Sequence, residues 1–334
     1  MKFSNLFSSG MVFSKGLPIR VFGTGNGSAT ITFAGITNNV VGKNNVWFTE
    51  FPPMDYGGPY TLKLSYGENS IVFDDIFIGE VYLFAGQSNM QFKVAEGKDD
   101  LNLCESNDKL RIFTCEHFEK NEFFTPKNGW VKADKETAKY CSALAHFTGI
   151  TLVKQKNVAI GIIVAYQGAS VIESWIPKGM LQENGIYIPE EEKGQSHFNA
   201  PSASWNIDGT LYDLTVKQII PFSLNAVVWY QGESDTTVSE AKIYGKELTI
   251  LINAWRTSFI NMQLPFVIIQ LPDYIKANQE AWKMVQQAQN DVQFELQNVK
   301  TVISADVCEN IDIHPSKKYE LAQRLATALI EIFN

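Results

Sequence analysis

Ser88 stands where a serine could act as a nucleophile. The apolar residues 81–85 and Gly86 precede it in the segment GEVYLFAGQSNM, which predicts a buried β-strand that ends at the glycine. Open α/β sheets place their ligands beyond the carboxyl ends of their strands. A serine at that point can lie at a helix N-terminus, whose backbone N–H groups stabilise the negative charge of an acyl-transfer intermediate. Serine is also a preferred helix N-cap, so a purely structural role is the alternative.

The histidine best placed to serve as a general base is His314. It stands between Asp312 and Pro315, on a segment that we expect to return to the carboxyl edge of the sheet. Neutral imidazole accepts a proton near neutrality because its unperturbed pKa is about 6.5. A Ser88–His314 pair therefore predicts a reaction rate that rises with pH through a transition near that value. The other histidines, none of them in a comparable motif, are His117, His146 and His197.

The elements that must position these residues belong to an α/β pattern over residues 76–334. Short apolar runs rich in β-branched residues alternate with longer segments of helical period, which indicates a parallel sheet covered by helices on both faces. The expected strands are residues 81–85, 158–165, 226–230, 266–270 and 301–304. The expected helices are residues 142–156, 239–259, 279–296 and 316–333, with Pro315 suited to the first turn of the last.

Residues 1–75 follow a different pattern. Apolar and polar positions alternate in short runs, as at residues 29–33 and 60–64, and glycine-containing turns separate the runs. We expect a small antiparallel β-sandwich without catalytic groups here. A chain of 334 residues has room for this domain and for an α/β domain over residues 76–334, because single cores rarely grow beyond roughly 250–300 residues.

Several separated blocks resemble the SGNH hydrolase superfamily, and within it the sialate O-acetylesterase family of carbohydrate esterases. In chain order they are GGPYTLKL, IGEVYLFAGQSNMQF, IGIIVAYQGASVIESWIP, AVVWYQGESD, LPFVIIQLPDY, AWKMVQQAQ and DIHPSKKYELAQRLA. The resemblance covers nearly the whole chain. It implies a three-layer α/β/α SGNH-type fold and a serine esterase that removes acetyl groups from carbohydrates through an acetyl-enzyme on Ser88. The implied partner is an O-acetylated sugar, O-acetylated sialic acid first, with acetylated xylan and other sugars left open.

The same resemblance implies an oxyanion hole. Its donors would be the backbone N–H groups of Ser88 and Gly168 and the side-chain amide of Gln231, which stands in the block WYQGES. An amide aimed at the oxyanion contributes on the order of 3 kcal/mol to transition-state stabilisation. A turn that requires glycine is the alternative for Gly168. For Glu233 a scaffold role, as a carboxylate hydrogen-bonded into a turn, is the simpler interpretation.

The acid that orients His314 is a further implied role, for which Asp312 is the first choice. In much of the superfamily an aspartate precedes the histidine by three positions, whereas here Ile311 occupies that position and Asp312 precedes His314 by two. The alternatives are Asp306, Glu309 and a Ser-His dyad without a carboxylate.

Composition argues against other partners. The 28 Lys and Arg against 36 Asp and Glu give a net charge of -8, which repels a nucleic-acid backbone. No stretch approaches the roughly 20 apolar residues that cross a bilayer, so we expect no membrane partner. Residues 1–16 lack an uninterrupted apolar core, which favours a soluble cytoplasmic protein over a secreted one, with a previously removed leader as the alternative.

Neither a metal ion nor an organic cofactor is expected. The cysteines form no CxxC pair, so we interpret Cys104, Cys115, Cys141 and Cys308 as buried thiols. The oligomeric state stays open. Two rival functions are a non-catalytic carbohydrate-binding protein, disfavoured because the serine, amide and histidine blocks are all present, and an esterase or lipase for apolar acyl chains.

Overall fold

A long, mostly parallel sheet carries the α/β part of the molecule. The computed structural model describes residues 1–97, 100–118 and 129–333. The sheet has the strand order β10-β9-β11-β8-β12-β13-β14 along its main path. These strands are β8 (Asn69–Gly86), β9 (Asn107–Thr114), β10 (Val131–Ala133), β11 (Ile160–Tyr166), β12 (Ala226–Tyr230), β13 (Phe266–Ile269) and β14 (Val299–Val302). All neighbours from β9 to β14 pair in parallel, and only β10 is antiparallel at its edge.

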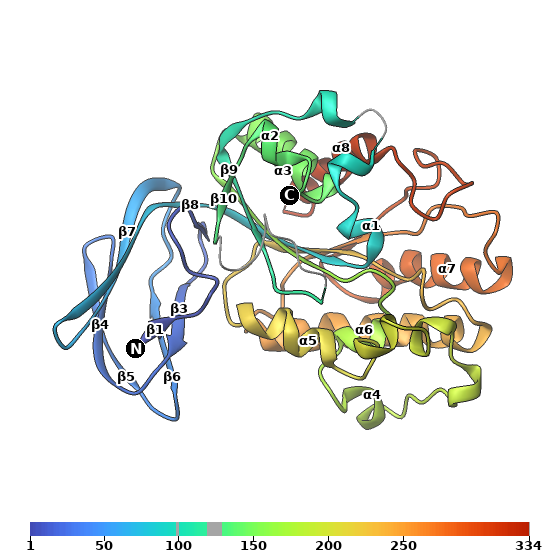
Figure 1. Cartoon of the computed structure of the whole chain (residues 1–334), viewed down its shortest axis with the longest axis horizontal. Coiled ribbons are helices and arrows are strands. Elements are labelled where there is room, and N and C mark those ends of the chain that lie inside the picture. Colours follow the sequence, from blue (N-terminus) through green and yellow to red (C-terminus); the bar gives the residue numbers. More distant parts are fainter. Residues whose placement is uncertain (98–99, 119–128, 334) are drawn as a thin grey trace.

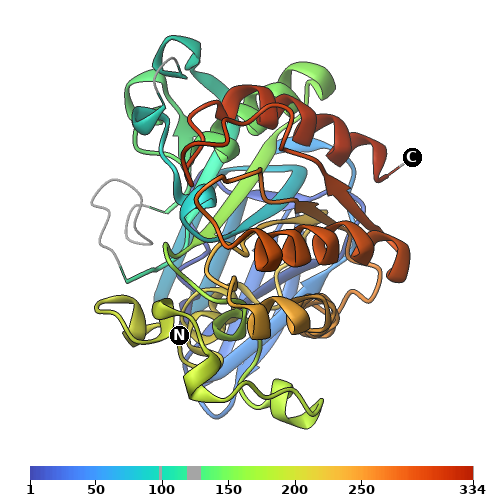
Figure 2. The ribbon, with the colours of Figure 1, turned by 90° about the vertical axis from the view of Figure 1, so that its right-hand side faces the viewer.

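Helices cover both faces of this sheet (Figure 1). The helices are α1 (Ser88–Gln91), α2 (Lys135–Ala138), α3 (Ala143–Lys156), α4 (Met180–Glu183), α5 (Thr210–Leu214), α6 (Val238–Ser258), α7 (Gln279–Glu295) and α8 (Lys318–Glu331). Helices α3 and α8 pack together on one face, and α6 and α7 pack together on the other. Figure 2 shows α8 and α7 one above the other, and both contact the edge strand β14.

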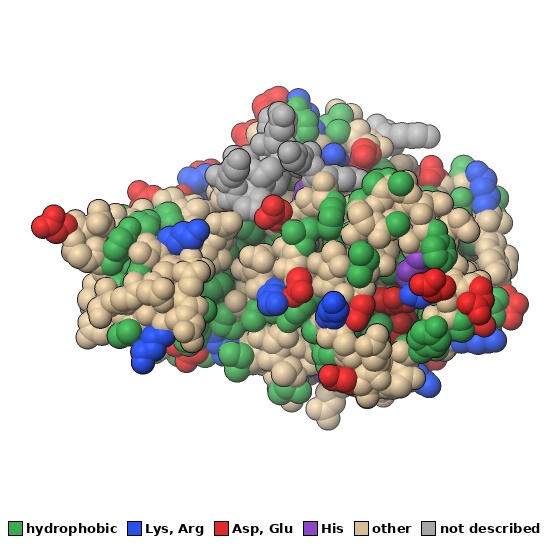
Figure 3. Space-filling view, turned by 60° about the horizontal axis from the view of Figure 1, so that its bottom comes forward, with side chains coloured by type: hydrophobic (Ala, Val, Ile, Leu, Met, Phe, Trp, Pro, Cys, Tyr) green, Lys and Arg blue, Asp and Glu red, His purple; other side chains and the backbone are tan. Residues whose placement is uncertain are grey.

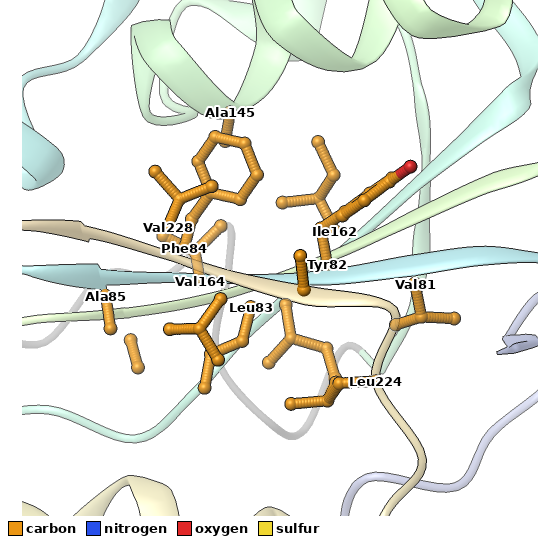
Figure 4. Packing of buried hydrophobic residues seen from close by; sticks show 14 of the residues in the cluster. Val81, Tyr82, Leu83, Phe84, Ala85, Ala145, Ile162, Val164, Leu224 and Val228 are labelled. Atoms are coloured by element: carbon orange, nitrogen blue, oxygen red, sulfur yellow. The ribbon is translucent and has the colours of Figure 1, made fainter. Parts of the chain in front are cut away.

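The core lies on both sides of β8. Its residues 81–85 are fully buried, and successive side chains point to opposite faces of the sheet. Phe84 projects toward Ala145 of α3, whereas Leu83 and Ala85 project to the other face (Figure 4). The expected three-layer α/β/α fold with a parallel sheet is therefore confirmed.

Beyond shifts of one or two residues at most element ends, a missed strand and the start of the last helix differ from the sequence-based expectation. Strand β9 was not predicted, because its first three residues, Asn107-Asp108-Lys109, are polar and the apolar run after them is short. The last helix begins at Lys318, so the placement of Pro315 in its first turn was wrong. Lys317 has a ψ of 70°, outside the helical range, and Pro315 belongs instead to the loop that carries His314.

The β-rich lobe is built from short strands and no helix over residues 1–75. One sheet contains β1 (Lys2–Phe3), β3 (Ile19–Thr24) and β6 (Val46–Phe51), and other strands are β2 (Val12–Ser14), β4 (Gly27–Phe33), β5 (Ile36–Gly42) and β7 (Gly57–Tyr66). Most pairings are antiparallel as expected, but β2 pairs with β8 in parallel.

Strand β8 connects this lobe to the central sheet. Its first half pairs with β7, and its second half lies between β11 and β12. The predicted boundary between residues 75 and 76 lies inside this continuous strand. The division into domains 1–75 and 76–334 stays a prediction.

Three of the four cysteines are buried thiols as expected. Cys104, Cys115 and Cys141 are buried, Cys308 is partly buried, and none of the four forms a disulfide. Burial raises the pKa of the Cys115 thiol to about 12, so this thiol stays protonated and unreactive at neutral pH. In the described part of the chain, no helix has the length and apolar character that crossing a membrane requires.

His146 makes the fold sensitive to acid. It lies fully buried in α3, and both ring nitrogens are buried without a hydrogen-bond partner. Burial lowers its pKa to about 4, so the unfolded chain binds a proton at higher pH than the folded chain does. The contribution of neutral His146 to stability is therefore fully present above about pH 6.5 and is lost as pH falls toward 4.

His146→Leu should reduce this acid sensitivity. We expect the loss of unfolding free energy between pH 7 and pH 4, measured by urea denaturation, to be smaller in the variant by up to about 3 kcal/mol. Identical pH dependence in the two proteins would show that His146 does not titrate on unfolding.

Candidate active site

A close approach of two strands positions the nucleophile. Gly86 ends β8 with a φ of +150°, and a Cβ atom there would lie 2.0 Å from the carbonyl oxygen of Tyr230 in β12. Only glycine fits this contact. The next residue, Gln87, donates its backbone N–H to the same carbonyl at 3.0 Å. Ser88 follows as the first residue of α1, where backbone N–H groups have no partner within the helix.

Ser88 and His314 lie together as the sequence predicted. The distance from Ser88 Oγ to His314 Nε2 is 2.7 Å, which is hydrogen-bond length. Both residues are partly buried. Burial lowers the pKa of His314 below its ordinary value, the nearby Lys318 ammonium lowers it further, and the carboxylates of Asp312 and Glu96 oppose this. The imidazole is therefore neutral at neutral pH and can accept the serine proton.

A buried polar chain ties the serine segment to the histidine loop. Asn89 Nδ2 donates to the carbonyl of Ile313 at 2.8 Å and to Glu233 Oε1 at 2.5 Å. Lys318 Nζ donates to Asn89 Oδ1 at 2.6 Å. Since Asn89 adjoins Ser88 and Ile313 adjoins His314, these bonds hold the two catalytic candidates at a fixed separation.

The carboxyl group of Glu233 bonds Asn89 rather than a turn, and its scaffold role stays a prediction. Its carboxyl group is buried, and burial raises its pKa to about 7 against the opposing effect of the Asn89 hydrogen bond. Sequence reasoning did not identify Asn89 and Lys318. The signal was present in the segment GQSNM, where a polar side chain follows the serine directly.

The Asp312 carboxylate contacts the backbone of His314. Asp312 Oδ1 accepts the His314 backbone N–H at 2.9 Å, which is the geometry of an Asx turn. Asp312 is exposed, and its charge raises the pKa of His314. The two alternative acids have other partners: Asp306 pairs with Arg324 at 2.6 Å, and Glu309 accepts from Ser316 at 3.0 Å. The acid role of Asp312 stays a prediction.

Gly168 lies beside the nucleophile. A Cβ atom at this position, just after β11, would lie 3.8 Å from the Ser88 Cβ. Its N–H donates to Gln91 Oε1 at 2.9 Å, so a side-chain carbonyl accepts this donor in the free protein. Gln91 thus occupies the donor that the implied oxyanion role of Gly168 requires, and this role stays a prediction.

Gln231 lies deeper than its implied role suggests. The residue is fully buried. Its Nε2 donates to Gln87 Oε1 at 3.1 Å, to the Ser170 carbonyl at 2.9 Å and to the Asp235 carboxylate. To bind an oxyanion, the amide would have to give up one of these acceptors. The contribution of Gln231 to the oxyanion hole therefore stays a prediction.

The described residues contain no group of three or more His, Cys, Asp or Glu side chains that could hold a metal ion. The chemistry that this arrangement can perform is nucleophilic attack by Ser88 Oγ, with His314 Nε2 as the base.

A family model and curated relatives both match this chain to sialic acid acetylesterases. A family model described as carbohydrate esterase, sialic acid-specific acetylesterase, matches residues 78–331. The curated sialate O-acetylesterase of Homo sapiens is 24% identical over an alignment that covers 97% of this chain and 69% of the relative. That of Mus musculus is 23% identical, with 97% and 72% covered.

Solved structures share the fold. The crystal structure of a carbohydrate acetylesterase from Xanthomonas citri has a TM-score of 0.85 and 23% identity, covering 99% of this chain and 75% of that chain. A protein from Arabidopsis thaliana has a TM-score of 0.52 and 19% identity, covering 77% and 99%.

The environment of His314 predicts a pH profile. With only neutral imidazole active, kcat/KM for 4-nitrophenyl acetate should rise with pH and level off, with a midpoint below about 6.5 because the pKa of His314 is lowered. The sequence alone placed this transition near the unperturbed value. His197→Gln, a change at another histidine, should keep the same midpoint. A midpoint above the unperturbed value would contradict the assignment.

Proposed function

The chain belongs to the carbohydrate esterase family of sialic acid-specific acetylesterases, and we propose that it hydrolyses sugar O-acetyl esters through an acetyl-enzyme on Ser88. The observation that carries this proposal is the 2.7 Å contact between Ser88 Oγ and His314 Nε2, at the carboxyl end of the central strand β8. A free serine hydroxyl is a weak nucleophile, and an adjacent neutral imidazole activates it.

In the first half of the reaction, Ser88 Oγ attacks the acetyl carbonyl carbon while His314 Nε2 accepts the serine proton. The tetrahedral intermediate collapses as the imidazolium donates that proton to the departing sugar oxygen. In the second half, His314 takes a proton from water, whose oxygen attacks the acetyl carbonyl. Acetate leaves and Ser88 regains its proton from His314, so these steps need no external cofactor.

The oxyanion would be stabilised by backbone donors next to Ser88. The N–H groups of Ser88 and Gly168 are the main candidates. The Gln91 carbonyl oxygen that now accepts the Gly168 N–H marks a position suited to an oxygen, and substrate would displace it. Gln231 is a third donor if its amide exchanges one of its internal acceptors.

O-acetylated sialic acid is the substrate class that we propose, because the family model and the curated relatives carry that name. Acetylated xylan and other acetylated sugars are the alternatives. Acetate release from acetylated sialic acids, acetylated xylan oligomers and a long-chain ester separates these possibilities. Turnover of the long-chain ester alone would overturn the proposal in favour of a lipase-type activity, and no turnover at all would favour a carbohydrate-binding protein.

Ser88→Ala should lower acetate release at least roughly a thousandfold without altering thermal unfolding, because it removes only the attacking hydroxyl. Ser316→Ala changes another serine of the histidine loop and should retain most of the activity. Near-normal turnover by Ser88→Ala would exclude the acetyl-serine mechanism.

Two substitutions at Asp312 separate its charge from its hydrogen bond. Asp312→Asn keeps an oxygen for the His314 N–H, and we expect turnover to fall by less than about tenfold because an exposed charge contributes little. Asp312→Ala also loses the acceptor that shapes the loop and should cost roughly tenfold to a hundredfold. A loss of more than about tenfold in Asp312→Asn would instead support the acid role that the family resemblance implies, with the carboxylate acting on the imidazole during turnover.

A further inference from the structure

A cavity whose lining includes neither Ser88 nor His314 lies among the loops between β11 and α6. Its volume is about 330 Å³, at the lower end of the range for small-molecule sites. The lining includes Glu173, Lys193, His197, Phe198, Asn206 and Glu247. Figure 3 views this face of the molecule, where acidic side chains gather beside a histidine.

Asn206 connects the cavity wall to the candidate active site. Its Oδ1 accepts the backbone N–H of Val171 at 3.0 Å, and its Nδ2 donates to the Ala169 carbonyl at 2.8 Å. Ala169 directly follows Gly168, the residue beside Ser88. The wall of the cavity and the predicted oxyanion segment are therefore held by one side chain.

Glu247 is the feature that points to a ligand. This residue of α6 is 1% exposed and lines the cavity, yet its Oε1 is buried without a hydrogen-bond partner. A buried polar atom without a partner costs roughly 1–3 kcal/mol, so native structures rarely keep one without a reason. Asp208, on the same cavity wall, also has an oxygen that is buried and unpaired.

The other polar side chains limit the charge that the cavity accepts. Glu173 pairs with Lys193 at 3.6 Å, and His197 pairs with Glu240 at 3.2 Å. Burial and the neighbouring Asp235, Glu173 and Glu240 raise the pKa of Glu247 well above its ordinary value. A raised pKa favours the protonated carboxyl group, which can both donate and accept a hydrogen bond, as a hydroxyl partner requires.

Two aromatic rings complete the cavity. Phe198 is 51% exposed and Tyr187 is 78% exposed, and both are lining residues. Exposed aromatic rings beside convergent polar groups are typical of a ligand site, because the ring covers an apolar face while the polar groups fix orientation.

We propose that this cavity binds a neutral, hydroxyl-rich sugar unit. The hydroxyl groups of the sugar supply hydrogen-bond partners for the unpaired oxygens of Glu247 and Asp208. The C–H face of the sugar ring packs on the aromatic ring of Phe198. Glu173 and Lys193 neutralise each other, and burial disfavours an uncompensated charge, so a neutral sugar is favoured over an anionic or ammonium sugar. The inference goes beyond the proposed esterase function, since it requires neither an acetyl group nor Ser88.

Binding is tested with probes that carry no acetyl ester. The probes are methyl β-D-xylopyranoside and methyl β-D-galactopyranoside as neutral sugars, the methyl glycoside of sialic acid as an anion, and glucosamine as a cation. Affinity for the full chain is measured by calorimetry and by ligand-observed NMR. The variants are Glu247→Leu, which removes the unpaired carboxyl group, and Phe198→Ala, which removes an exposed ring. Phe294→Ala removes another exposed ring, on α7 outside the cavity, and is the matched control.

We expect a neutral glycoside to bind wild-type protein and to lose at least about tenfold in affinity in Glu247→Leu and in Phe198→Ala, with Phe294→Ala within about twofold. No binding of either neutral glycoside, preferential binding of the anion or of glucosamine, or binding insensitive to Phe198→Ala would each overturn the proposal. Phe198→Ala keeps the test decisive if Glu247→Leu does not fold. Because no acetate release is measured, failure here is distinct from failure of the esterase proposal.

Discussion

The contact between Gly86 and the Tyr230 carbonyl is the constraint on which the site depends. It brings the ends of β8 and β12 closer than any side chain would permit. From this point β8 leads to Ser88, and β12 leads to Gln231 and Glu233. Because both segments start from one backbone contact, their side chains meet directly: Gln231 bonds Gln87, and Asn89 bonds Glu233.

Buried polar groups hold the loop that carries His314 in place. The Lys318 ammonium is fully buried, bonds Asn89, and lies 4.8 Å from the centroid of the Phe92 ring. Burying a charge is costly unless it is hydrogen-bonded or paired, and apolar packing would serve stability at least as well. What the polar chain provides is a single register between the serine segment and the histidine loop. That register sets the 2.7 Å contact, while the cation lowers the pKa of His314.

The sequence predicted the parts of the molecule that local pattern determines. The apolar runs at 81–85 and 226–230 predicted central strands, and the family blocks around Ser88 and His314 predicted that these distant residues meet. The hydrogen-bond partners of the site residues were harder to predict from the sequence. Nothing in the spacing of Asp312 tells whether its carboxylate faces the imidazole or the backbone, and the letters around Gln231 do not reveal that Ser170, Gln87 and Asp235 already accept its amide. For Gln231 the choice depends largely on contacts with segments more than 60 residues away in sequence, as with Ser170. For Asp312 the contact is local, but a two-residue spacing allows either orientation of the carboxylate.

The length of β8 also affects how the molecule unfolds. A single strand of 18 residues forms an antiparallel ladder with β7 in the β-rich lobe and parallel ladders with β11 and β12 around the nucleophile. Loss of either set of ladders frees the end of a strand on which the other set depends, which couples the two lobes into one cooperative unit. Substitutions in the β-rich lobe that weaken the pairing of β7 with β8 are therefore expected to destabilise the strand that carries Ser88, although they lie far from the site.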